Sequence, residues 1–308
     1  MLDPKELYRF AAEQPAEGEL ERPVLLHALG GFIDAGFAGK LAADHLLETL
    51  PHRVIAEFDV DQLYDYRARR PPMMFVEDHW ESYEAPELVL RAVTDTNGTE
   101  FLMLTGPEPD VQWERFASAV TQLVDHYDVR LAIGIHAIPM AVPHTRPAGL
   151  TAHATRRDLV AGERAWVGRV QVPGNIAGLL EFRLGEAGKD AAGYAVHVPH
   201  YLAQAEYPDA SVSLLEAVTK VSGLALPTEA LRVAGVQTRE AVEEQIGQQP
   251  EVAAVVHALE QQYDAYVAAQ GSALPLADDT SELPTADELG AELERFLAEE
   301  NDRRGRDG

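Results

Sequence analysis

Two histidines stand three residues apart, His197 and His200, in the segment VHVPHY at the end of an apolar run. Residues three apart on one strand point to opposite faces, so the two imidazoles share an ion only if the strand ends at Pro199. A zinc site needs three or four ligands, and neither an HExxH motif nor a third nearby ligand is present. Three further histidines are spaced too irregularly for one face of one element: His136, His144 and His153. The sequence therefore predicts no metal site and no cofactor.

The glycine-rich segment GGFIDAGFAGK, residues 30–40, follows the first apolar run and precedes a helical pattern. A phosphate-binding loop places lysine directly after its second glycine, but Phe37 stands there, and the GxGxxG spacing is absent. We interpret the segment as a tight turn with positive φ at one or two glycines. An alternative stays open, in which Asp34 and the backbone amides of the helix start line a small polar pocket.

Nucleophilic catalysis has little support, because the chain has no cysteine and no GxSxG motif. Ser211 and Ser213 stand at an expected helix start, where capping of backbone amides is their predicted role. A dense basic cluster occurs in YDYRARRPP, with Arg67, Arg69 and Arg70 among tyrosines. We expect it to bind a carboxylate or phosphate, or to neutralise an acidic surface of a neighbouring subunit.

Strand and helix patterns alternate along the sequence, which is typical of the α/β class. The predicted strands and helices position the residues described above. We expect strands at 23–31, 52–63, 85–94, 99–110, 129–147, 169–172 and 191–201. We expect helices at 34–51, 110–129, 176–188 and 209–224. The strand at 129–147 is almost uninterrupted in its apolar character, which indicates a strand covered on both faces.

After Pro227 the strand signals stop, and the sequence predicts three parts. The first is an α/β core at 1–226, and the second is a helical extension at 227–271 with a break at Gln249 and Pro250. The third, 272–308, is an acidic linker and a short capped helix with an apolar stripe that we expect to bind a partner or a second subunit: Leu289, Leu293, Phe296 and Leu297.

The composition limits the classes of partner that the protein can bind. The chain has 308 residues, with 51 acidic against 25 basic side chains and a formal net charge of -26, which repels nucleic acid and anionic membranes. Residues 1–22 lack the pattern of a signal peptide, and no apolar run reaches the 18 residues expected of a membrane span. We expect a cytoplasmic protein that binds neither nucleic acid nor membranes.

Five segments together resemble the bacterial branch of the proteasome assembly chaperone type 2 family: GGFIDAG, DYRARRPP, GIHAIPMAVPHTRP, PGNIAGLL and VPHYLAQAEYPDASVSLLEAV. The resemblance covers about residues 20–225. It implies a fold similar to purine nucleoside phosphorylases, with a mixed central sheet flanked by helices. Members in other lineages help to assemble proteasome subunits without catalysis. Some archaeal relatives end in a hydrophobic-tyrosine-any-residue tail, whereas this chain ends in RRGRDG.

Loops that follow parallel strands lie at one edge of a sheet, so we expect three motif loops to frame a shallow crevice. The candidate pocket residues are Gly30, Gly31, Asp34, Gly36, His136, Pro173, Gly174, Asn175, His200 and Tyr201. The predicted function is a non-catalytic assembly or interaction protein that forms homo-oligomers, such as a trimer, with a protein client such as proteasome subunits. The alternative is a phosphorylase- or hydrolase-type enzyme acting on a nucleoside-like or other small polar substrate.

Overall fold

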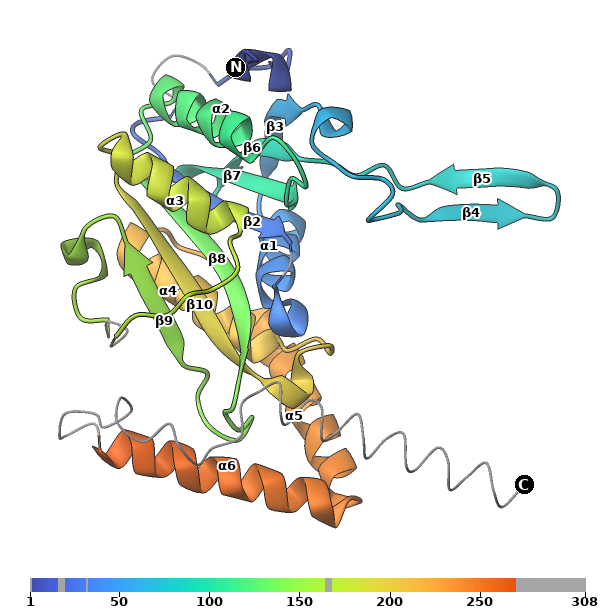
Figure 1. Ribbon diagram of the computed structural model, residues 1–308, viewed down its shortest axis with the longest axis vertical. Helices are drawn as coiled ribbons and strands as arrows, with labels where there is room; N and C mark the ends of the chain where they lie inside the picture. Colours follow the sequence, from blue (N-terminus) through green and yellow to red (C-terminus); the bar gives the residue numbers. More distant parts are fainter. Residues whose placement is uncertain (1, 16–19, 32, 164–167, 270–308) are drawn as a thin grey trace. The chain divides into compact units, whose positions relative to one another are not determined.

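An eight-stranded mixed sheet forms the centre of the computed structural model, which describes residues 2–15, 20–31, 33–163 and 168–269 (Figure 1). The strand order is β1-β3-β6-β7-β2-β8-β10-β9. The strands are Tyr8–Phe10 (β1), Val24–Gly30 (β2), His52–Phe58 (β3), Val89–Thr94 (β6), Glu100–Pro107 (β7), Leu131–Met140 (β8), Leu150–Ala154 (β9) and Ala191–Pro199 (β10). The predicted mixed α/β class is confirmed, and the likeness to purine nucleoside phosphorylases stays a prediction.

The four central strands, β7, β2, β8 and β10, run parallel to one another, and the outer strands pair antiparallel. Parallel strands need cover on both faces, which explains the near-continuous apolar sequence of β8. One face packs against α1 (Ala38–Thr49) and α4 (Pro208–Ser222), with Leu26 and Ile133 in that core. The other face packs against α2 (Trp113–His126) and α3 (Ile176–Glu186), with Leu25 and Phe116 in that core.

Short 3₁₀ turns connect several of these elements: Pro4–Leu7 (η1), Ala35–Phe37 (η2), Val60–Gln62 (η3), Arg157–Val160 (η4) and His200–Leu202 (η5). Helix α4 ends at Gly223, whose φ of 76° is the left-handed conformation that glycine adopts without steric cost. The predicted turn between the strands at 85–94 and 99–110 is confirmed as the β6–β7 hairpin.

The helical extension consists of α5 (Glu229–Gly247), which packs against α4, and α6 (Pro250–Ala269). The break between them falls at Gln248 and Gln249, one residue from the predicted position. Residues 1–263 form one compact unit, and residues 264–308 form a second, of which 264–269 are described. The predicted boundaries at 226 and 271 stay predictions, and the predicted stripe from Leu289 to Leu297 lies outside the described residues.

Several local expectations were wrong or incomplete. Residues 169–172 form no strand, because Val170 and Val172 are more than 60% exposed and have no strand partner. Ser211 caps nothing; its buried hydroxyl donates to the carbonyl oxygen of Ala38 at 2.9 Å and ties α4 to α1. The sequence patterns also missed β1, β9 and a separate hairpin, β4 (Met73–Val76) with β5 (His79–Tyr83).

No helix in the described part of the chain is both long enough and apolar enough to cross a membrane.

Candidate functional site

The β4–β5 hairpin, which we call the arm, projects from the body of the protein as its own two-stranded sheet (Figure 1). Pairing of Met73 with Tyr83 and of Phe75 with Trp80 sets its register, and the Phe75 and Trp80 rings meet edge to face at 5.0 Å. An isolated two-stranded hairpin is at best marginally stable in water. Packing among its own side chains is therefore a weak source of stability for the arm.

The arm exposes large apolar side chains instead of burying them. Five of them are between 49% and 63% exposed: Met73, Met74, Phe75, Trp80 and Tyr83. Single exposed apolar side chains are common on proteins, whereas a contiguous group marks an interaction surface. Tryptophan and tyrosine are also the residues that contribute most at protein interfaces. The arm thus has the composition of a contact surface for another protein.

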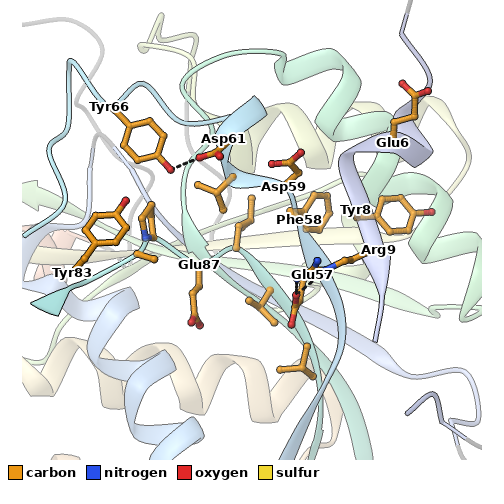
Figure 2. A pocket seen from close by; sticks show the side chains of 16 residues that line it. Glu6, Tyr8, Arg9, Glu57, Phe58, Asp59, Asp61, Tyr66, Tyr83 and Glu87 are labelled. Atoms are coloured by element: carbon orange, nitrogen blue, oxygen red, sulfur yellow. Dashed lines mark hydrogen bonds and ion pairs between the residues drawn. The ribbon is translucent and has the colours of Figure 1, made fainter. Parts of the chain in front are cut away.

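At the base of the arm lies an open cavity of about 810 Å³, which we call the acidic groove (Figure 2). Its walls come from η1, β1, β3 and the segments that lead into and out of the arm. Among the described residues, five carboxylates and one arginine line it: Glu6, Glu57, Asp59, Asp61 and Glu87, with Arg9. The groove is therefore strongly negative and complementary to a basic partner.

Two contacts organise the acidic groove. Arg9 is paired with Glu57, with 2.6 Å between Nη2 and Oε2, so the arginine of the wall is already engaged. The hydroxyl of Tyr66 donates to Asp61 Oδ1 at 2.6 Å, and this hydrogen bond raises the pKa of Tyr66. Figure 2 shows Tyr66 and Tyr83 on the arm side of the groove, opposite Tyr8 and Arg9.

The three arginines of the basic cluster differ in their surroundings. Arg69 is engaged internally: it donates to the carbonyl oxygen of Glu108, pairs with Asp110 at 2.8 Å and lies over the Tyr64 ring at 4.5 Å. Arg67 and Arg70 are exposed and form no ion pair within the described part of the chain. Only Arg67 and Arg70 are therefore placed to meet a partner.

A second cavity, of about 450 Å³, lies on the face of the sheet that α3 covers, and we call it the histidine cavity. Its wall is mostly apolar, from Leu29, Ile138, Ala195 and Ile176 among others. The polar groups of its wall are Glu108, His136, Thr151, His153 and Asn175. Apolar walls with a few polar groups at this volume are typical of small-molecule sites, which span roughly 300 to 1,000 Å³.

Two glycines of the central strands make room for imidazole rings on this face. Gly134 and Gly193 are register partners, with His27 beside the first and His153 beside the second. A Cβ at position 134 would lie 2.6 Å from His27 Cε1, and one at position 193 would lie 2.1 Å from His153 Cε1. The His136 ring lies 6.3 Å from that of His153.

The histidines differ in their hydrogen bonds. His153 Nδ1 lies 2.7 Å from Glu181 Oε2, and His197 Nε2 lies 2.8 Å from the Thr151 hydroxyl. Neither ring nitrogen of His136 has a hydrogen-bond partner among the described residues. Burial, with a further contribution from His153, lowers the pKa of His136 to about 4, so its ring is neutral at pH 7.

The start of α3 closes one side of the histidine cavity, and its first amides are already bonded. Asn175 Oδ1 accepts from the amide of Gly178 at 2.7 Å, and Glu108 Oε1 accepts from the amide of Ile176 at 2.6 Å. The Glu108 carboxylate packs directly on Gly31, where a Cβ would lie 2.1 Å from Oε2. Within the described ranges, no three histidine or acidic side chains are arranged to hold a metal ion.

Comparison with protein families gives a match to the PAC2 family over residues 28–246. The chain belongs to the PAC2 family. Among solved structures, a Mycobacterium tuberculosis protein of unknown function, Rv2714, is 46% identical, with a TM-score of 0.82 over 86% of this chain and 91% of the other. A Corynebacterium glutamicum protein of unknown function is 38% identical, with a TM-score of 0.81 over 85% of this chain and 98% of that one.

A third similar structure is the Mycobacterium tuberculosis proteasome-assembly chaperone homologue Rv2125, at 25% identity and a TM-score of 0.70, over 76% of this PAC2 chain and 99% of that one. The Pyrococcus furiosus archaeal proteasome activator PbaB shares 19% identity, with a TM-score of 0.58 over 78% of this chain and 98% of that one, and shows the fold alone. The comparison with curated proteins finds no match.

In this PAC2 chain the histidine cavity gathers four of the ten candidate pocket residues: Gly31, His136, Pro173 and Asn175. Gly30 is the last residue of β2, and Gly174 stands between Pro173 and Asn175 without being part of the cavity wall. The chemical partners that the sequence did not single out are Glu108, Thr151 and His153.

Asp34 and Gly36 have structural roles on the other face of the sheet. Asp34 accepts from the amides of Gly39 and Lys40 at 2.8 and 2.9 Å, so its own carboxylate occupies the amides that were expected to line a polar pocket. Gly36 has a φ of 64°, as expected for the turn, and a Cβ there would lie 2.8 Å from Tyr207 Cβ.

The segment from Pro199 to Tyr201 lies apart from the histidine cavity. Strand β10 ends at Pro199, and the Tyr201 hydroxyl accepts from the amide of His144 at 2.9 Å while its ring packs on the α1 and α4 side of the core. His200 is exposed. The segment is thus a strand-to-helix junction, in which the two histidines of VHVPHY lie on different sides.

Proposed function

We propose that this PAC2 chain is a non-catalytic interaction protein that assists the assembly of a protein complex related to the proteasome. The description of Rv2125 as a proteasome-assembly chaperone homologue supports this role, as does family membership. The observation that carries the proposal is the arm, whose five exposed apolar side chains need a protein surface to cover them. The cytoplasmic location expected from the sequence fits such a client.

Self-association through the arm is the second part of the proposal. The arm carries its apolar side chains next to the exposed Arg67 and Arg70, and the acidic groove lies at its base. In a ring of identical subunits, the arginines of one copy meet the acidic groove of the next, while the apolar side chains of the arm are buried. Cyclic homo-oligomers, including the expected trimer, close in this way.

The enzyme alternative is not favoured. A phosphorylase must hold a phosphate anion, but the described lining of the histidine cavity contains neither lysine nor arginine. The amides of Ile176 and Gly178 at the start of α3 are bonded to side-chain oxygens of the chain itself. An anion would have to displace the Glu108 carboxylate to reach the Ile176 amide, and the Asn175 side chain to reach the Gly178 amide.

Light scattering after gel filtration tests self-association on the full chain. We expect one defined oligomer for the parent and monomers for the double variant Phe75→Ser/Trp80→Ser. Phe182→Ser is the matched control, because Phe182 is 60% exposed but lies on α3, away from the arm. A double variant that keeps the parent's mass would contradict the role of the arm.

Co-expression with the proteasome subunits of the same organism tests the assembly role. The proposal expects a higher yield of assembled proteasome particles with the parent chain, and no increase with the double variant. If the parent leaves the yield unchanged and co-purifies with no proteasome subunit, the proteasome link is wrong, while the self-association result stands by itself.

A further inference from the structure

The interaction function proposed above does not involve the histidine cavity. We propose that it binds a small, uncharged organic molecule with an apolar body and one polar head that both donates and accepts a hydrogen bond. The volume of about 450 Å³ suits such a ligand. The apolar wall from Leu29, Ile138 and Ile176 suits its body.

His136 determines the chemistry of the head group. A neutral imidazole has one N–H donor and one nitrogen acceptor, and in this ring neither has a hydrogen-bond partner among the described residues. The ring is half-buried and lines the cavity, so a ligand in the cavity can reach nitrogens that no described side chain occupies. A ligand amide, hydroxyl or heterocycle can accept a hydrogen bond from the N–H of this ring. It can also donate a hydrogen bond to the other ring nitrogen.

His153 faces His136 across 6.3 Å and is held by Glu181, so its ring orientation is fixed. If Nδ1 carries the proton that it shares with Glu181, Nε2 is an acceptor. The Thr151 hydroxyl, on the neighbouring row of the same face, is held by His197 at 2.8 Å. The cavity therefore presents pre-oriented hydrogen-bonding groups, which favour a ligand with a defined polar end.

The charge of the cavity excludes an anionic ligand. Its described wall has one carboxylate, Glu108, and no lysine or arginine, and Glu181 stands behind His153. The Glu108 carboxylate already accepts from the amide of Ile176 and is buried against Gly31, so it is committed to the fold. A phosphate or carboxylate would meet the Glu108 carboxylate and no lysine or arginine in the described, mostly apolar wall, which is strongly unfavourable.

Three probes with the same ring separate the charge classes: benzamide, benzoate and benzylammonium. Saturation-transfer NMR on the full chain at pH 7 measures an apparent Kd for each. We expect saturable binding of benzamide, at least tenfold tighter than that of benzoate. Benzoate binding as tightly as benzamide, or benzylammonium binding more tightly than benzamide, would overturn the proposed ligand class.

Variants locate the binding. His136→Phe keeps an aromatic ring but removes both nitrogens, so we expect benzamide to bind about five- to tenfold more weakly, as for the loss of one neutral hydrogen bond. Ala177→Leu fills the cavity from α3 and should abolish saturable binding. If Ala177→Leu lowers the Tm, Val172→Trp at the exposed edge replaces it as the blocking variant. His200→Ala is the control outside the cavity and should bind benzamide like the parent. If the blocking variant and His136→Phe both keep the parent's Kd for benzamide, the proposed site is wrong.

Discussion

The imidazole of His153 lies directly over the Cα of Gly193 on the neighbouring strand, where a Cβ would stand 2.1 Å from Cε1. Real Cβ contacts are never this short, so one of the two groups must move if position 193 gains a side chain. On the next strand, Gly134 receives the His27 ring in the same way, at 2.6 Å. Glycine at these two positions is what allows β2 and β9 to place the His27 and His153 rings over the neighbouring strands.

Gly193→Ala should therefore destabilise the protein. Added atoms in a packed core usually cost about 1 to 3 kcal/mol, and here the His153 ring must also leave Glu181. Urea unfolding measures the change in the free energy of unfolding. Gly247→Ala, at the end of α5 with nothing within 4 Å of the added Cβ, is the control and should be neutral or stabilising. Equal stability of the two variants would show that the His153 ring has room to shift.

His27 makes the stability depend on pH. Complete burial lowers the pKa of His27 from 6.5 to about 4, with smaller contributions from His136 and His153. Between these pH values the unfolded chain binds a proton that the folded protein does not, so the free energy of unfolding decreases as the pH falls from 6.5 to 4. The full decrease attributable to His27 is roughly 3 kcal/mol.

His27→Leu tests this assignment. Its Nδ1 has no hydrogen-bond partner, so replacement by an apolar side chain should cost little at pH 7. Between pH 6.5 and 4 the variant should lose less stability than the parent, in urea unfolding measured at half-unit steps. Parallel pH profiles would mean that His27 does not cause the dependence.

The order of strands and helices could be predicted because it rests on local patterns. The apolar run of β8, the glycine stop of α4 at Gly223 and the turn that follows Asp95 are each contained in a few consecutive residues. The prediction of a strand at 169–172 was wrong because strand pairing is not a local property. Alternation of Val170 and Val172 looks like a strand, but a strand exists only where a neighbour pairs with it.

The histidine cavity could not be predicted, because it depends on strand register. His27, His136 and His153 are distant in sequence and come together because β2, β8, β10 and β9 align Gly134 with Gly193. The arm escaped notice for another reason: its apolar residues are exposed, so no core pattern marks them. The two short runs around Glu77 and Asp78 were a signal for a hairpin that composition alone did not separate from a loop.

Arg69 and Arg67 should respond differently to truncation. Arg69→Ala removes a hydrogen bond to the Glu108 carbonyl, the ion pair with Asp110 and the packing on Tyr64, so we expect a loss of about 1 to 3 kcal/mol in unfolding free energy. Arg67→Ala, in the same exposed segment, should leave that free energy within about 0.5 kcal/mol of the parent.

Light scattering of the same two variants separates fold from interface. Arg67→Ala should weaken the oligomer without loss of stability. The difference from the parent should be largest at low salt and shrink as salt is added, because salt screens the exposed charge pairs that the parent forms. If Arg69→Ala is as stable as the parent, the internal role assigned to Arg69 is wrong.

Asp95 joins the β6–β7 turn to the chain after α4, and its loss should loosen both. The side chain is 4% exposed; Oδ1 accepts from the amides of Asn97 and Thr99 at 2.9 and 2.8 Å, and Oδ2 accepts from the amide of Ala225 at 2.8 Å. Asp95→Ala leaves the partly buried Ala225 amide and the two turn amides without their partner, so we expect a loss of about 1 to 3 kcal/mol in urea unfolding. Asp95→Asn keeps an oxygen for the turn amides and places an amide group toward Ala225, so it should recover only part of this loss. Amide hydrogen exchange distinguishes the two connections. We expect faster exchange at Ala225 in both variants, and faster exchange at Asn97 and Thr99 in Asp95→Ala alone. Unchanged exchange at Ala225 in Asp95→Ala would show that α4 is held to the sheet by its packing and not by this carboxylate.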